Sequence, residues 1–127
     1  MADAVLLDSY RERIAAHMAG KGTLKPIGYV AFGDGGHDRE TMLPIPPEET
    51  DTGLKHEVLR KPVTLITQED SLSVTGRGTV ENNELLTIQL SEAALLDTDG
   101  NFIAIKCFAP KIKEGDERYE IAIKLRF

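Results

Sequence analysis

The sequence contains no tryptophan, and only 6% of its 127 residues are aromatic. A surface that stacks on nucleobases or sugars usually needs more rings, so these two classes of ligand are disfavoured. Cations are also few, because 15 Lys and Arg residues stand against 21 Asp and Glu residues, which gives a net charge of −6. Contact with a phosphate backbone needs clustered Lys and Arg, so we expect no nucleic-acid partner.

Cysteine occurs once, at Cys107, so no disulfide can form within the chain. Cys107 lies in an apolar run, which predicts a buried thiol and not a reactive one. No apolar run approaches the roughly 20 residues that cross a bilayer, and no signal-like stretch follows Met1. We therefore expect no membrane partner and a protein made in a cytoplasm.

The length and composition are typical of one soluble domain spanning residues 1–127. Residues 3–19 predict an amphipathic helix, because Leu6, Tyr10, Ile14 and Met18 recur every four positions on one stripe. Gly20 is suited to end this helix in a left-handed conformation. The helix would either lie on a sheet or contact a partner helix in an oligomer.

A short strand is predicted at residues 27–32, and glycines and prolines then dominate residues 33–52. A loop of this length is unusual in a small domain, so we expect it to be functional, mobile, or an arm that lies on a neighbouring subunit. Its apolar middle is the candidate interaction segment: Leu43, Pro44, Ile45, Pro46 and Pro47.

Residues 54–60 fit a short helix or a strand, and strands are predicted near residues 63–67 and 72–80. Gly76 and Gly78 interrupt the second of these, which indicates a bulge or a close approach of another backbone.

The range 85–127 has the clearest pattern of antiparallel strands. Strands are predicted at residues 85–90 and 102–108, and the Asp-Gly pair in residues 97–101 favours a hairpin turn. The turn superficially resembles a calcium loop, but its glycine and its twelfth residue do not fit an EF-hand. Residues 119–127 alternate between apolar and charged, as in a half-buried strand, and residues 111–118 predict a charged turn before it.

Together these elements predict an α+β fold: an N-terminal amphipathic helix packed on a mainly antiparallel sheet or sandwich, with a long Pro-rich loop.

Asp34, His37 and Asp38 stand among three glycines in residues 33–38 and are the chemically richest cluster. They could bind a divalent metal or transfer protons, with Asp51 and His56 close by in space. Alternatively, the glycines relieve strain in a turn and the acidic side chains cap backbone amides. We favour the turn. No serine stands in a nucleophile elbow and Cys107 has no basic neighbour, so we expect no catalytic residue, no cofactor and no enzyme activity.

The order of several segments resembles the N-terminal domain of phage tail-collar fibre proteins. Residues 27–36 (IGYVAFGDGG) look like that family's strand ending in Gly-Asp-Gly, and a Pro-rich stretch follows at residues 43–47 (LPIPP). Residues 52–63 (TGLKHEVLRKPV) are similar to its Leu, Glu, Arg and Pro block. After the strand at 85–90, residues 91–104 (SEAALLDTDGNFIA) look like its Glu-x-x-Leu-Phe-Asp-x-Asp-Gly-x-Leu-Ile-Ala segment, and a Pro-Lys stretch and an alternating strand complete the order.

The match covers roughly residues 27–127, with Ala94 where the family usually has Gly and Leu96 where it has Phe. Members of the family continue into a fibre shaft, whereas this sequence stops at Phe127, so we expect a short stand-alone version. The resemblance implies a virion structural protein, encoded by a phage or prophage. It would dock at the tail collar or baseplate as an oligomer, with a trimer favoured, after assembly in the bacterial cytoplasm. The alternative is a metal- or ligand-binding module built on Asp34, His37 and Asp38, hydrolytic if it is an enzyme.

Overall fold

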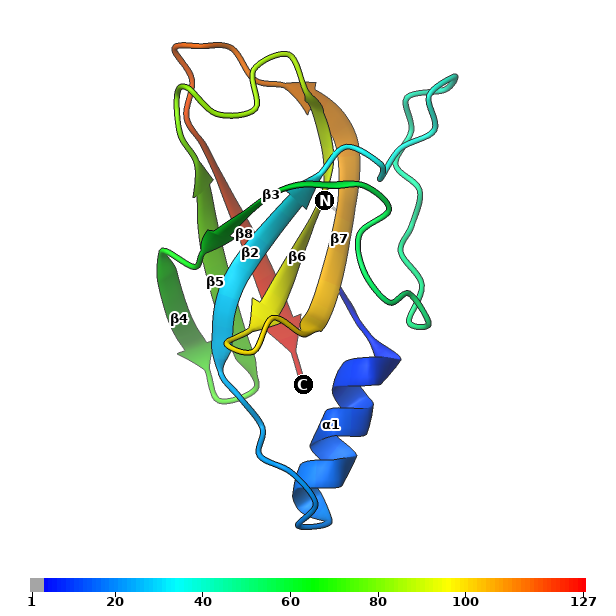
Figure 1. Ribbon diagram of the computed structural model, residues 1–127, viewed down its shortest axis with the longest axis vertical. Helices are drawn as coiled ribbons and strands as arrows, with labels where there is room; N and C mark the ends of the chain where they lie inside the picture. The colour runs from blue at the N-terminus through cyan, green and yellow to red at the C-terminus, as the bar shows by residue number, and fades with distance from the viewer. Residues whose placement is uncertain (1–3) are drawn as a thin grey trace.

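The computed structural model describes residues 4–127, which form two antiparallel sheets and one short helix (Figure 1). The chain is mostly β, in agreement with the α+β class at this coarse level. In chain order the elements are β1 (Val5–Leu6), α1 (Asp8–Met18), β2 (Ile27–Gly33), β3 (Glu57–Pro62), β4 (Leu65–Asp70), β5 (Ser73–Val80), β6 (Gln89–Asp97), β7 (Phe102–Ile112) and β8 (Tyr119–Arg126).

The two sheets differ in width. The wider sheet has the strand order β1-β7-β6-β2-β3, and the narrower one has the order β4-β5-β8. β5 contacts β2 and β3, while β8 contacts β6, so the main core lies between the sheets. β7 and β1 therefore extend beyond the last strand of the narrower sheet. The core residues are Tyr10, Val30, Phe32, Val80, Leu90, Ala93, Leu95, Ile103, Ala104, Ile123 and Leu125.

Glycines in β5 allow the sheets to approach closely. A Cβ atom on Gly78 would lie 2.7 Å from the Cβ of Val30, and one on Gly76 would lie 2.7 Å from a methyl group of Leu95. Both distances are shorter than real Cβ contacts, but the facing atoms belong to side chains, so these glycines make room for Val30 and Leu95 and not for another backbone.

The outer face of the wider sheet is buried as well. Leu7, Ala94, Leu96 and Cys107 belong to a second apolar cluster there, and Leu54 from the connection between β2 and β3 packs against it. The predicted burial of the Cys107 thiol is confirmed. Desolvation, with a further contribution from the nearby Glu92 carboxylate, raises the pKa of this thiol to about 11.

The hairpin predicted at residues 97–101 is present between β6 and β7. The Asp97 carboxylate accepts hydrogen bonds from the backbone amides of Asp99 and Asn101, both at 2.9 Å. Gly100 has a φ of +84°, and its amide donates to the Asp97 carbonyl at 3.0 Å. The acidic side chain is therefore used to hold the turn, as the Asp-Gly signal predicts.

The N-terminal helix is shorter than the predicted range 3–19, of which residue 3 lies outside the described part. Leu6 belongs to β1 and pairs with Ala104, so the helix begins only at Asp8. The predicted apolar stripe is wrong at both ends, because Leu6 lies before the helix and Met18 is 79% exposed. Tyr10, between them, is buried. Gly20, with a φ of +74°, follows the helix as expected. Within residues 4–127, no helix is both long and apolar enough to span a membrane.

The strand expected at residues 85–90 is wrong in where it starts. It begins only at Gln89, because Leu85 and Thr87 have positive φ angles of 53° and 67°. Within the charged turn before β8, Lys113 is 1% exposed, and its ammonium donates to the carbonyl of Asn82 at 2.7 Å. Lys113 therefore links the β7–β8 connection, residues 113–118, to the β5–β6 connection, residues 81–88.

Candidate functional site

The glycine-rich segment after β2 passes directly over the start of β6. A Cβ atom on Gly33 would lie 2.5 Å from a carboxylate oxygen of Glu92, and one on Gly36 would lie 2.4 Å from the carbonyl oxygen of Ser91. Only glycine fits at these positions, because any side chain would collide with backbone or with a buried carboxylate. The Gly-Asp-Gly-Gly sequence is therefore required by packing.

Glu92 is the centre of this contact. Its side chain is buried, with 1% of the residue exposed, on the outer face of the wider sheet. Its carboxylate accepts hydrogen bonds from the amides of Gly35 at 3.0 Å, Lys55 at 3.0 Å and His56 at 2.9 Å. Three amide donors compensate the carboxylate for the water it loses on burial. One side chain thus holds both ends of the connection between β2 and β3, residues 34–56.

A second pair lies beside this carboxylate. The amide of Gly36 donates to the hydroxyl oxygen of Ser91 at 2.9 Å, and Nδ1 of His37 lies 2.7 Å from the same oxygen. A hydroxyl oxygen has two lone pairs and one hydrogen, so after accepting from Gly36 it can either donate to Nδ1 or accept from it, according to the tautomer of His37. Nε2 is buried and has no hydrogen-bond partner. Ser91 is 0% exposed, so its hydroxyl is inaccessible to a substrate in this conformation.

The three residues predicted as candidate metal ligands have separate partners. Asp34 pairs with Nδ1 of His56, and His37 contacts Ser91. The Asp38 carboxylate caps the amides of Glu40 at 2.8 Å and Thr41 at 3.0 Å. The bond from Thr41, followed by that from Glu40, lowers the pKa of Asp38. Among residues 4–127, no three His, Cys, Asp or Glu side chains gather in a way that could hold a metal ion.

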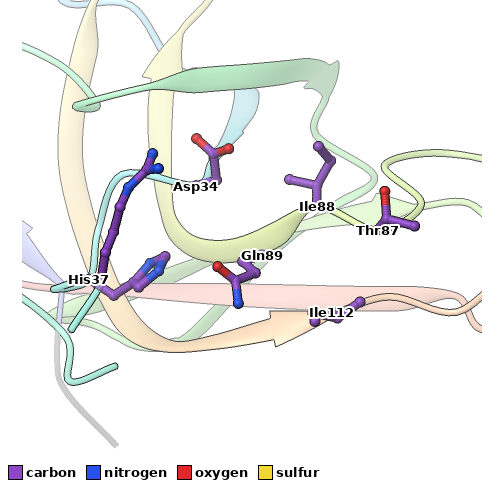
Figure 2. A pocket seen from close by; sticks show the side chains of 7 residues that line it. Asp34, His37, Thr87, Ile88, Gln89 and Ile112 are labelled. Atoms are coloured by element: carbon purple, nitrogen blue, oxygen red, sulfur yellow. The ribbon is translucent and has the colours of Figure 1, made fainter. Parts of the chain in front are cut away.

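A shallow hollow of about 280 Å³ lies next to this cluster (Figure 2). Figure 2 shows His37 on one side of it and Thr87, Ile88 and Ile112 on the other, with Gln89 between them. The hollow mixes hydrogen-bonding and apolar groups. Its full lining is Asp34, His37, Arg39, Thr87, Ile88, Gln89 and Ile112.

The candidate interaction segment, residues 43–47, follows the glycine segment closely for part of its length. The amide of Ile45 donates to the carbonyl of Gly36 at 2.8 Å, and Pro44 forms an isolated bridge with His37. Leu43, in contrast, is 64% exposed. Further along, the carbonyl of Glu49 accepts from the amide of Asp8 at 2.8 Å, so this connection also contacts the start of α1.

The sequence analysis missed a second candidate surface at the end of the sheets near α1. A hollow of about 440 Å³ opens there, and its rim includes Ile66 and Phe127, of which Phe127 is 57% exposed. Leu72, also exposed, adjoins Phe127 because its carbonyl accepts the Phe127 amide at 2.8 Å. We call this hollow and its rim the apolar end. Its lining residues are Tyr10, Leu24, Lys25, Pro26, Ile27, Ile66, Val74, Ile103, Leu125 and Phe127.

Glu92 and Ser91 were missed as well, although they interrupt the apolar run of β6. A charge inside such a run was the available signal, because a buried carboxylate needs several donors. Leu65 and Ile66 on β4 are both exposed, and β4 is an edge strand. Comparison with known proteins gives no further guidance: no known family matches this chain, and no curated protein is significantly similar to it.

Proposed function

We propose that the chain is a structural component of a phage or phage-tail-like particle that works in the baseplate or fibre-attachment region. It acts by docking to other subunits and performs no catalysis. The ordered resemblance along residues 27–127 supports the class of particle. The exposed apolar residues of the apolar end support the docking role.

The proposal also includes the placement of the helix and of the long loop. We infer that α1 packs on the wider sheet, because Tyr10 joins the main core and a guanidinium nitrogen of Arg13 donates to the carbonyl of Phe102 at 2.7 Å. We also infer that residues 34–56 form one long Pro-rich loop whose ends Glu92 holds. A domain built in this way presents its loop on one side and its apolar end on another, as a docking module requires.

The apolar end has the properties of an interface core. Ile66, Leu72 and Phe127 are large, apolar and exposed around a concave surface. Contiguous exposed apolar surface of this kind is uncommon on soluble monomers and marks association sites. Lys25 is the one charged residue in the lining of the hollow, and depletion of charge is typical of interface cores.

The occupant we propose is another copy of the same chain, with a trimer favoured by the resemblance. In a ring of three, each copy would bury its apolar end against a different face of the next copy, because cyclic trimers use heterologous contacts. The particle would then supply further partners among tail or baseplate proteins.

Light scattering coupled to size exclusion tests this proposal. We expect the wild-type chain to form an oligomer, and we expect Phe127→Asp to dissociate it without lowering the melting temperature appreciably. Leu86→Asp is the matched control, because Leu86 is apolar and exposed but lies outside the apolar end. A wild-type monomer at all accessible concentrations would contradict the proposal. An oligomer lost in Leu43→Asp but kept in Phe127→Asp would place docking on the candidate interaction segment instead.

A second candidate function is a ligand-binding module at the hollow in Figure 2. The buried Nε2 of His37 favours it, since a ring nitrogen that lacks a hydrogen-bond partner among residues 4–127 gains one when a complementary ligand group arrives. Metal binding is the weaker form of this idea, because Asp38 is engaged with backbone amides. Thermal denaturation with added Ca²⁺, Mg²⁺, Mn²⁺ or Zn²⁺ tests it: a rise in melting temperature that is absent in Asp34→Ala would support a metal site.

A further inference from the structure

β8 is an edge strand, and its pairing with β5 shows which of its backbone amides and carbonyls point away from the sheet. Within the described residues 4–127 it pairs with β5 alone, and Ala122 lies opposite Arg77. The Arg77 carbonyl accepts from Thr64 on the β4 side at 2.8 Å, so this pair exchanges no hydrogen bonds across β5 and β8. The Ala122 carbonyl accordingly points away from β5 and accepts from the Lys106 ammonium at 3.3 Å. Because the pattern alternates, the amides of Glu120, Ala122 and Lys124 all point outward.

A groove of about 330 Å³ lies along this edge, between β8 and β7. Leu90, Phe108, Tyr119 and Ile121 supply its apolar lining. The groove therefore offers two features of a strand-binding site: outward backbone donors along one wall and apolar pockets beside them.

The unequal width of the two sheets limits what can bind at the β8 edge. β8 faces β6, so β7 and β1 overhang the β8 edge by about two strand spacings, roughly 10 Å. If a second copy paired its own β8 with this edge, both wider sheets would lie on the same side and their overhanging strands would collide. A single extended segment fits beneath the overhang, whereas a second whole domain does not.

The charge at the groove indicates what kind of segment enters. Lys106, Lys111 and Arg118 line it together with Glu120, and Glu81 lies 3.8 Å from Arg118, so three cations stand beside two carboxylates in a chain with a net charge of −6. This local excess of cations complements acidic side chains. The alternation of a strand would place apolar side chains toward the groove and acidic ones toward its rim.

We propose that an extended segment of a partner protein, alternating apolar and acidic residues, adds to β8 as a fourth strand of the narrower sheet. This deepens the docking function proposed above by naming a partner chemistry and a place, and it rests on that function. In the free protein, Lys106 covers part of the edge by bonding the Ala122 carbonyl, as inward-pointing lysines do on other exposed edges.

The test uses fluorescence anisotropy with a labelled seven-residue peptide that alternates Val with Glu. A peptide of the same composition with its residues blocked instead of alternating, and one alternating Val with Lys, are the reference probes. We expect the alternating acidic peptide to bind at least tenfold more tightly than either. Equal binding of the acidic and basic peptides, or no binding of the acidic one, would overturn the proposal.

Glu120→Pro and Glu120→Ala form the matched pair. Both remove the carboxylate, but only proline removes the outward amide, and proline is tolerated where an edge amide faces solvent. We expect Glu120→Pro to weaken acidic-peptide binding at least tenfold relative to Glu120→Ala. Unchanged binding in a folded Glu120→Pro protein would refute strand addition.

Lys111→Glu covers the case in which the proline variant does not fold. We expect this exposed substitution to weaken the acidic peptide at least fivefold and to strengthen the basic one, and no change in either would also refute the proposal. Oligomerisation through the apolar end is measured separately by light scattering, and Lys111 lies outside that surface. Failure of strand binding can therefore be distinguished from failure of the wider docking role.

Discussion

Replacing Glu92 with glutamine tests whether one buried carboxylate holds the connection between β2 and β3. The substitution keeps the size and shape of the side chain but removes its charge and one of its two acceptor oxygens. Oε2 accepts from Gly35 and His56, while Oε1 accepts from Lys55. In the variant, the amide oxygen can keep the first two bonds, and the NH₂ group then faces the Lys55 amide, donor against donor.

The expected cost follows from these three bonds. Losing the bond to Lys55 and leaving its amide unsatisfied costs about 1–3 kcal/mol, and converting two charge-assisted bonds to neutral ones costs about 1 kcal/mol more. Glutamine recovers part of this because it is less costly to bury than a carboxylate. We therefore expect Glu92→Gln to lower the free energy of unfolding by about 1–3 kcal/mol.

Urea denaturation monitored by circular dichroism measures this change, and Glu120→Gln is its control. Glu120 is exposed and makes only a loose ion pair with Arg77 at 3.6 Å, so its replacement should cost less than about 0.5 kcal/mol. Amide hydrogen exchange adds a local readout, because Gly35, Lys55 and His56 should exchange faster in Glu92→Gln only. If both variants unfold at the same urea concentration, the carboxylate does not hold the connection.

Three further outcomes are expected. Gly36→Ala should destabilise the protein by about 2 kcal/mol or more, because its Cβ would lie 2.4 Å from the Ser91 carbonyl, whereas Gly22→Ala, with nothing within 4 Å, should be nearly neutral in the same melt. Asp97→Ala removes two amide bonds from the hairpin turn and should cost about 1–3 kcal/mol of unfolding free energy; a loss below 0.5 kcal/mol would contradict its role. Cys107, with a pKa raised to about 11, should be about 0.1% thiolate at pH 8, so Ellman's reagent should label it only after denaturation, and rapid labelling of the folded protein would show that it is exposed.

The strands were the most predictable part of the fold, because their signals are local. The alternation from Tyr119 to Leu125 and the Asp-Gly turn at residues 97–101 depend on neighbouring residues only, and both were located correctly. The glycines of β5 also predicted a close approach, but the atoms that approach them belong to the side chains of Val30 and Leu95 and not to another backbone. The strand expected at residues 85–90 failed because Leu85 and Thr87 adopt left-handed conformations that nothing in their residue types indicates.

The candidate site was less predictable, because its contacts join distant parts of the chain. Asp34, His37 and Asp38 looked like one group in sequence, yet each has its own partner, and the partner of His37 lies in another element, β6. The glycines around them are explained by Ser91 and Glu92, which lie more than fifty positions later. The exposure of Ile66 and Phe127 depends on the width of the narrower sheet, which no local pattern encodes.

The carboxylate of Glu92 also makes the connection at residues 34–56 a separable part of the molecule. Since the amides of Gly35 and Lys55 are held by one group, what lies between them can change in length with little effect on the sheets. Closing a loop twice as long costs only about 0.6 kcal/mol of chain entropy. The tip near Met42 and Leu43 is therefore a natural insertion point, where a peptide epitope or a binding loop could be grafted onto this scaffold.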